Sequence, residues 1–145
     1  MSDKPRVLFL CTGNSARSQL GEALLRHKAG DRFEVYSAGL EPKGVNLYTL
    51  RVLDELGIDA HTQTSKPLSD YLGRVHFGYV ITVCADADAK CPAVFPGMGQ
   101  RLRWPFDDPA AVEGADEARL AKFREIRDQI AARLDVWLAE GGGAG

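Results

Sequence analysis

The segment Cys11-Thr12-Gly13-Asn14-Ser15-Ala16-Arg17-Ser18 constrains the fold more than any other part of this 145-residue chain. It follows the apolar residues 7–10 and precedes a helical pattern, so it predicts a strand, a tight loop and a helix N-terminus in succession. The backbone N–H groups of such a loop converge on one point, where the helix dipole favours negative charge. Arg17 adds a planar guanidinium that can hold two oxygens of a tetrahedral oxyanion. The segment therefore predicts a cradle for an oxyanion with Cys11 as its thiolate nucleophile.

The neighbours of Cys11 support this interpretation. The helix N-terminus and Arg17 favour a thiolate over a thiol, the Ser18 hydroxyl can donate to the sulfur, and Asn14 suits a left-handed turn. A buried cysteine at the end of a strand, before a capped helix, is the alternative. It is the weaker interpretation, because it explains neither the Gly-Asn turn nor the arginine. The candidate oxyanion-binding residues are Thr12, Gly13, Asn14, Ser15, Ala16 and Arg17.

The remaining pattern alternates strands with helices and predicts a single α/β domain over residues 1–140, followed by a flexible glycine-rich tail at 141–145. Such alternation implies a four-stranded parallel sheet with helices on both faces. The expected strands are residues 6–10, 33–38, 79–83 and 101–104. The expected helices are residues 18–28, 46–57, 68–75 and 115–139, the last with an apolar stripe of Leu120, Phe123, Ile126, Ile130, Leu134 and Trp137.

Composition restricts the partners and the compartment. The chain is 45% hydrophobic and 26% charged with a net charge of −2, which argues against nucleic acid or an anionic membrane as a partner. The first apolar run is too short for a signal peptide or a membrane span, so we expect a cytoplasmic protein. Three cysteines in a reducing compartment predict reactive or buried thiols rather than a disulfide framework.

Chemically reactive side chains follow three of the expected strands. They are Cys11, Cys84 and the pair Asp107-Asp108. Ligands of parallel sheets bind outside the carboxyl ends of the strands, so these three places are expected to form one site. The irregular residues 85–100 lie beside it, and a loop of that length is usually functional or mobile.

Four segments resemble the low-molecular-weight tyrosine phosphatase superfamily and, within it, the thioredoxin-coupled arsenate reductases. These segments are residues 11–19, 36–39, 84–92 and 106–109. The resemblance implies a flavodoxin-like strand order 2-1-3-4. The Cys84-x6-Cys91 pair points to the reductases, because a phosphatase has no need of two further thiols.

The resemblance implies a relay of three thiols with no cofactor. Cys11 attacks arsenate, Cys84 attacks Cys11, and Cys91 resolves the disulfide, which thioredoxin reduces. Asp108 matches the general acid of the family's Asp-Pro pair. Each role has a simpler alternative, since free cysteines are often small buried hydrophobes and an Asp before proline often forms an Asx turn.

A second group of residues matches positions that some relatives use to bind a structural potassium ion. Asn14, Glu22 and Ser37 are retained, whereas Lys66 stands where those relatives have an aspartate. We expect the Lys66 ammonium to take the place of the ion and to interact with Glu22, so that no potassium binds. The three histidines lack metal-ligand spacing, and no close Cys pair suggests zinc, so no metal site is expected.

The sequence therefore predicts a cytoplasmic, monomeric arsenate reductase with thioredoxin as its reductant. The first alternative is a low-molecular-weight phosphatase that hydrolyses phosphotyrosine or aryl phosphates. A thiol sensor or an oxyanion-binding module without enzymatic activity is a third possibility.

Overall fold

The computed structural model describes residues 4–85 and 98–140. The predicted tail at 141–145 and Cys91 lie outside these ranges. The helices and strands, in chain order, are β1 (Arg6–Cys11), α1 (Arg17–Ala29), β2 (Glu34–Gly39), α2 (Leu47–Asp54), the 3-10 helix η1 (Leu68–Asp70), β3 (Phe77–Thr82), β4 (Met98–Arg103), the 3-10 helix η2 (Pro109–Ala111) and α4 (Asp116–Ala139).

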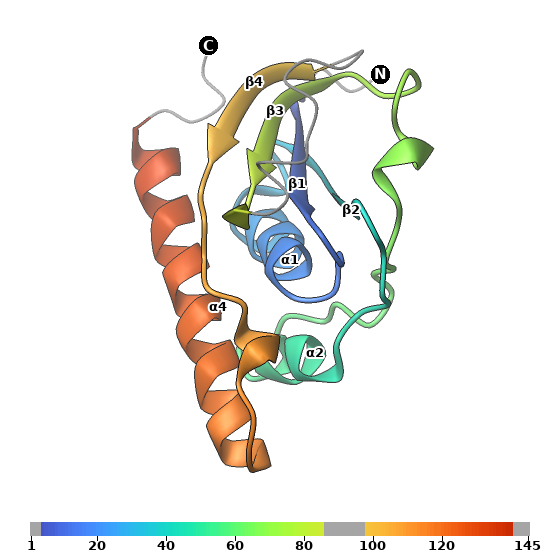
Figure 1. Ribbon diagram of the computed structural model, residues 1–145. Helices are drawn as coiled ribbons and strands as arrows, with labels where there is room; N and C mark the ends of the chain where they lie inside the picture. Colours follow the sequence, from blue (N-terminus) through green and yellow to red (C-terminus); the bar gives the residue numbers. More distant parts are fainter. Residues whose placement is uncertain (1–3, 86–97, 141–145) are drawn as a thin grey trace.

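The four strands form one parallel sheet in the order β2-β1-β3-β4, which confirms the predicted fold class and strand order (Figure 1). β1 is central: Leu8 lies between Tyr36 of β2 and Val80 of β3. The apolar run of β1 is fully buried, as expected for a strand covered on both faces. The carboxyl ends of all four strands therefore meet at one edge of the sheet.

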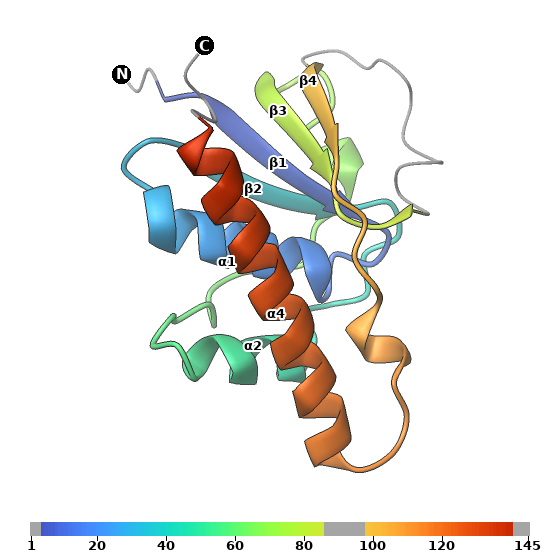
Figure 2. The same cartoon turned by 90° about the vertical axis from the view of Figure 1, so that its left-hand side faces the viewer.

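Helices α1 and α4 lie side by side across one face of the sheet (Figure 2). α1 approaches β1 so closely that a Cβ at Gly21 would lie 2.6 Å from a ring carbon of Phe9. The predicted apolar stripe of α4 is confirmed, because all six of its residues are buried. Trp137 packs on Phe33 and Tyr79, with ring centroids 5.3 Å apart in both pairs, and thereby joins α4 to the sheet.

The opposite face is covered in part by η1 and the turn that follows it. The Tyr71 ring packs edge-on against Tyr36 of β2 and Phe77 of β3, with centroids 5.5 and 5.8 Å away. Helix α2 packs instead against α1 and α4, beyond the carboxyl edge of the sheet (Figure 2). No helix within residues 4–85 and 98–140 is both long and apolar enough to cross a membrane.

Two predicted helices are shorter than expected. The helix predicted at 68–75 is only the 3-10 turn η1, and Gly73 has a positive φ of 76° that an α-helix cannot contain. The helix predicted at 46–57 ends at Asp54, although the predicted cap is confirmed, because the Asn46 side chain accepts a 2.8 Å hydrogen bond from the Tyr48 backbone N–H.

Two strands start earlier than predicted. Each contains a glycine near its beginning, and glycine in a sequence suggests a loop rather than a strand. β3 begins at Phe77 and β4 at Met98, and Gly78 and Gly99 lie within them. A Cβ at Gly99 would lie 2.5 Å from the carbonyl oxygen of Gly78, so close approach of the two strands accounts for that glycine. In the sequence the same residue indicates a loop.

Candidate active site

The segment between β1 and α1 surrounds a small cavity at the carboxyl edge of the sheet. The cavity has a volume of about 150 Å³. It is lined by Cys11, Thr12, Gly13, Ser15, Ala16, Arg17, Lys43, Asp108 and Ala110. The structure therefore brings together five of the six predicted oxyanion-binding residues, the predicted nucleophile and the predicted acid.

Cys11 is the last residue of β1, and its sulfur is held by two hydrogen bonds. The backbone N–H of Asn14 donates to Sγ over 3.2 Å, and the Ser18 hydroxyl lies 2.8 Å from Sγ. The turn that brings Asn14 back to the sulfur uses a left-handed conformation, with φ at 46°. Among the described residues Asn14 is the only non-glycine with positive φ, as predicted from its residue type.

The hydrogen-bond network around Asn14 positions the Ser18 hydroxyl oxygen beside Cys11. Asn14 Oδ1 accepts a 2.8 Å hydrogen bond from the Lys66 backbone N–H, which can only donate, so Nδ2 is the atom facing Ser18. Nδ2 donates to Ser18 Oγ over 2.7 Å. Because Nδ2 can only donate, the Ser18 hydroxyl hydrogen does not point to Asn14, and it can be donated to Cys11 Sγ, 2.8 Å away. A donor to the sulfur stabilises a thiolate over a thiol.

The start of α1 leaves its first N–H groups without a side-chain partner. The residue before the helix, Ala16, has no capping group, and the first turn carries no acidic side chain. These N–H groups and the positive end of the helix dipole favour an anion in the adjacent cavity. This is the electrostatic feature that the sequence predicted for the loop.

Arg17 links the loop to the segment after β4. Its Nη1 donates to the carbonyl oxygen of Phe106 over 3.0 Å, and Nη2 lies 3.9 Å from Asp108 Oδ2. The guanidinium side chain is mostly buried, with 17% of its surface exposed. Arg17 therefore lies at the cavity wall with its orientation set by a backbone carbonyl.

Asp108 combines the two interpretations that its sequence context allowed. Its Oδ1 accepts a 3.0 Å hydrogen bond from the Ala110 N–H and so caps η2, which is the Asx turn expected before a proline. Its Oδ2 faces Arg17, and the residue lines the cavity. The turn fixes one carboxylate oxygen and leaves the other toward the oxyanion cavity.

Cys84 lies beside the same loop, although 72 residues separate it from Thr12. The Thr12 hydroxyl oxygen and Cys84 Sγ are 3.7 Å apart and form a hydrogen bond. Cys11 and Cys84 are 3% and 2% exposed, and neither forms a disulfide. The structure thus brings two of the three predicted thiols to the same end of the sheet.

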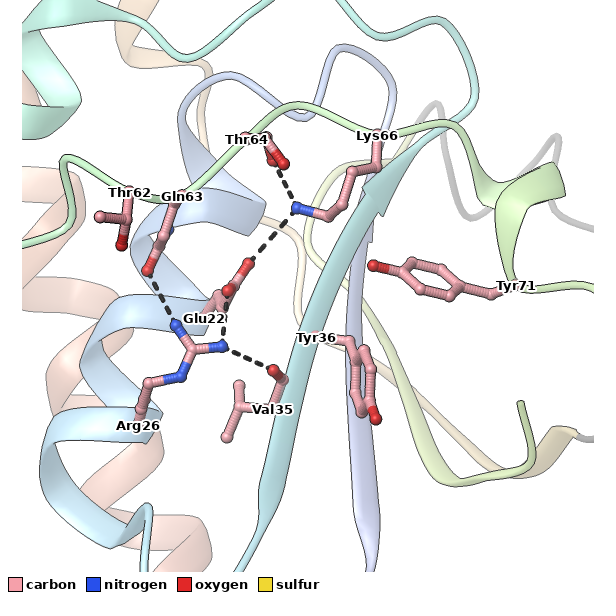
Figure 3. A pocket seen from close by; sticks show the side chains of 9 residues that line it. All are labelled: Glu22, Arg26, Val35, Tyr36, Thr62, Gln63, Thr64, Lys66 and Tyr71. Atoms are coloured by element: carbon pink, nitrogen blue, oxygen red, sulfur yellow. Dashed lines mark hydrogen bonds and ion pairs between the residues drawn. The ribbon is translucent and has the colours of Figure 1, made fainter. Parts of the chain in front are cut away.

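A group of charged side chains supports the loop from its far side (Figure 3). Glu22 of α1 accepts a short hydrogen bond from the Ser37 hydroxyl and a 2.6 Å bond from Arg26. The Lys66 ammonium donates to the carbonyl oxygen of Thr64 and lies 3.8 Å from Glu22 Oε1. Partial burial lowers the pKa of Lys66, which the nearby Glu22 carboxylate opposes. Glu22, Arg26, Thr64 and Lys66 are among the residues that line a second cavity, of about 310 Å³.

The end of β2 also touches the loop. A Cβ at Gly39 would lie 2.7 Å from the Thr12 carbonyl oxygen and 2.9 Å from Asn14 Cβ. Gly39 is therefore required for the loop and the sheet edge to pack together. Its backbone N–H donates to the Lys66 carbonyl oxygen over 2.8 Å, which fixes residue 66 next to Asn14.

Two features of the site were not identified from the sequence. Lys43 lines the cavity and Thr12 contacts Cys84, but both depend on the path of the chain. Lys43 lies in the irregular segment Pro42-Lys43-Gly44, which carries no periodic signal. Within the described ranges, no group of three or more His, Cys, Asp or Glu residues is arranged to hold a metal ion.

The sequence is similar to one protein family and to named members with the same described activity. Residues 6–141 match the family described as low molecular weight phosphotyrosine protein phosphatase. An arsenate reductase of Shouchella clausii is 43% identical over 139 residues, which cover 95% of this chain and 98% of that protein. One of Bacillus subtilis is 42% identical over 136 residues, which cover 93% of this chain and 96% of that protein.

Solved structures give the same result. A structure described as an arsenate reductase in the oxidized state matches with a TM-score of 0.75 and 27% identity, over 93% of this chain and 97% of the other. A thioredoxin-dependent arsenate reductase of Corynebacterium glutamicum matches with a TM-score of 0.67 and 32% identity. That match covers 96% of this chain and 64% of the other.

Proposed function

The chain belongs to the low molecular weight phosphotyrosine protein phosphatase family, and within that family we propose that it reduces arsenate to arsenite through the thiols of Cys11, Cys84 and Cys91. The observation that carries the proposal is the position of Cys84, whose sulfur contacts Thr12 of the oxyanion loop. A hydrolase needs only Cys11 in this place. A second buried thiol at the loop is what a two-electron reduction requires.

In the first step the Cys11 thiolate attacks the arsenic atom of bound arsenate. A sulfur–arsenic bond forms and one arsenic–oxygen bond breaks, and the oxygen leaves as water after taking up protons. Asp108 is the proposed donor in its protonated form, because its carboxyl group lines the cavity and lies 3.9 Å from Arg17. Ser18 and the Asn14 N–H stabilise the thiolate before the attack. Thr12, Gly13, Asn14, Ser15, Ala16 and Arg17 surround the oxyanion.

In the second step the Cys84 thiolate attacks Sγ of Cys11. A disulfide forms, the sulfur–arsenic bond breaks, and its electron pair remains on arsenic, which leaves as arsenite. Cys91 then attacks Cys84, so that Cys11 is released as a thiolate and the disulfide lies between Cys84 and Cys91. A thioredoxin-type dithiol reduces that disulfide and returns the enzyme to its first state. The thioredoxin-dependent relative from C. glutamicum supports this choice of reductant.

Lys66 is proposed to replace the potassium ion that some relatives bind beside the loop. Its ammonium lies 3.8 Å from Glu22 Oε1, which also accepts from the Ser37 hydroxyl, and its backbone N–H donates to Asn14. The protein would then need no monovalent cation. A cytoplasmic location is part of the same proposal, because thioredoxin-type reduction belongs to a reducing compartment. The proposed oligomeric state is a monomer.

The decisive experiment compares two reactions in the same variants. Cys84→Ser and Cys91→Ser are expected to abolish multiple-turnover arsenate reduction, measured as arsenate-dependent NADPH oxidation with thioredoxin and thioredoxin reductase. Hydrolysis of p-nitrophenyl phosphate, which needs only Cys11, Arg17 and Asp108, is expected to persist in both. Cys11→Ser is the matched control and loses both reactions.

Three results separate this proposal from the alternatives. Unimpaired arsenate reduction in both serine variants would overturn the relay. Efficient phosphotyrosine hydrolysis by the wild-type protein, without arsenate reduction, would identify it as a phosphatase. Oxyanion binding without either reaction would identify a sensor or binding module.

A further inference from the structure

Lys43 is a lysine at the oxyanion cavity to which neither the relay nor the loop motif gives a role. It lines the cavity together with Cys11, Arg17 and Asp108. The residue is exposed, and its side chain makes no ion pair or hydrogen bond with another residue in the described part of the chain. A lysine with no partner at the entrance of an anion site is available to the ligand.

The backbone of Lys43 is fixed against the loop. Residues 40–43 run along it, and three of their N–H groups donate to it: Leu40 to the Cys11 carbonyl oxygen, Glu41 to that of Thr12, and Lys43 to that of Gly13. The last two bonds are 2.8 and 2.9 Å long. Lys43 Cδ lies 3.4 Å from the position that a Cβ would take at Gly13, so the stem of the side chain covers Gly13. The ammonium is therefore tethered within reach of the cavity.

The charges around the cavity leave room for a second cation. Arg17 lies 3.9 Å from Asp108 Oδ2, and Cys11 attacks as a thiolate in the proposed first step. An arsenate or phosphate near neutral pH brings up to two more negative charges. One guanidinium and one helix N-terminus face all of these anionic groups.

From this arrangement we infer that Lys43 is a second cationic binding group of the oxyanion site, which contacts the outer oxygens of a bound inorganic oxyanion. The inference rests on the proposed function, because it concerns the same cavity and the same class of ligand. Lys43 lies outside the loop motif, and its inferred role is to bind the oxyanion rather than to take part in the thiol chemistry.

The test is the affinity for inorganic phosphate, a stable analogue of arsenate, measured by isothermal titration calorimetry on the full chain. Removal of one charge close to the ligand is expected to weaken phosphate binding in Lys43→Met by about fivefold to tenfold at low ionic strength. Lys43→Arg keeps the charge and is expected to remain within about twofold of wild type. The difference between Lys43→Met and wild type should shrink in high NaCl, because an exposed charge is screened.

Arg74→Met is the matched control for the change in net charge. Arg74 is exposed and precedes β3, so it lies near the amino edge of the sheet, opposite the cavity. Equal weakening in Arg74→Met and Lys43→Met would overturn the inference, as would a Lys43→Met affinity equal to wild type. Thermal unfolding of each variant confirms that the fold is intact.

Phosphate binding involves no thiol exchange, so the two proposals can fail separately. If phosphate binding depends on Lys43 but arsenate is not reduced, the relay is wrong and the binding role of Lys43 stands. If arsenate is reduced and Lys43→Met binds phosphate normally, the relay stands and the role of Lys43 is wrong.

Discussion

Lys66 has two separate roles beside the active-site loop. Its backbone holds the loop, and its side chain places a positive charge near Glu22 of α1. Its backbone N–H donates to Asn14 Oδ1, and its ammonium lies 3.8 Å from Glu22 Oε1. The backbone of residue 66 thus affects the geometry of the loop, whereas its side chain affects only the charge near Glu22. A substitution at residue 66 can therefore change the charge while the backbone hydrogen bond to Asn14 is kept.

We predict that a potassium ion from the solvent can take the place of the Lys66 ammonium when residue 66 is changed to aspartate. In Lys66→Asp the ammonium is replaced by a carboxylate near Glu22, so the melting temperature is expected to rise when NaCl is replaced by KCl at equal ionic strength. Wild type is expected to melt at the same temperature in both salts, because its own ammonium occupies that region. Lys66→Met, which removes the charge and adds no ligand, serves as the control and should not respond to potassium. A clear stabilisation of wild type by potassium over sodium would contradict the prediction.

At the scale of elements, α2 is joined to α4 by a cluster of charges at its C-terminus. Glu55 accepts hydrogen bonds from Arg124 at 2.7 Å and from Arg127 at 2.9 Å. Arg127 is buried and also donates to the Val52 carbonyl oxygen. The hydrogen bonds from Arg124 and Arg127 lower the pKa of Glu55 below its ordinary value of 4.5, against a smaller effect of burial.

This pKa shift predicts how the connection responds to pH. A carboxyl group whose pKa is depressed in the folded state stabilises the fold above its unfolded pKa and loses that contribution as the pH falls through the folded value. Glu55→Gln is therefore expected to lower the free energy of unfolding at neutral pH, by up to about 1 kcal/mol for such a partly exposed cluster. The two proteins should converge in urea denaturation as the pH falls below 4.5.

The exposed Glu113 provides the control for that comparison. Glu113→Gln changes the same charge away from Arg124 and Arg127, and it is expected to alter the free energy of unfolding by less than about 0.5 kcal/mol. A constant difference between Glu55→Gln and wild type at all pH values would show that packing, and not ionisation, is responsible.

At the scale of the whole molecule, the oxyanion cavity joins parts of the chain that meet only in the folded state. Its lining comes from the loop after β1, from the segment after β2 and from η2 with the residue before it. An anion bound there contacts all three and also the N-terminus of α1. Ligand binding should therefore stabilise the entire fold rather than the loop alone.

We predict that inorganic phosphate raises the melting temperature of the wild-type protein. At a concentration of one hundred times Kd the stabilisation is about 2.7 kcal/mol, which corresponds to a rise of about 5–10 °C for a domain of this size. Differential scanning calorimetry with and without phosphate measures it. Arg17→Met should lose most of this rise, and an undiminished rise in that variant would place the bound anion elsewhere.

The parts of the fold and site that the sequence predicted are those with a local physical signal. The apolar run of β1, the left-handed Asn14 and the stripe of α4 each follow from a residue type or a spacing. The start of β4 was missed because Gly99 resembles a loop residue until β3 lies beside it. The positions of Lys43 and of Thr12 beside Cys84 were missed because they depend on chain segments far apart in sequence.

The bond from the Lys66 backbone to Asn14 also has a consequence for how such proteins diverge. Because a backbone N–H makes the bond, every residue type except proline can supply it at position 66. A substitution at position 66 can thus exchange the side chain, and under the proposed role of Lys66 the response to potassium, while the backbone hydrogen bond that anchors the loop is kept. Under the same proposal, the cation preference of such a protein is set by one side chain that does not itself anchor the loop.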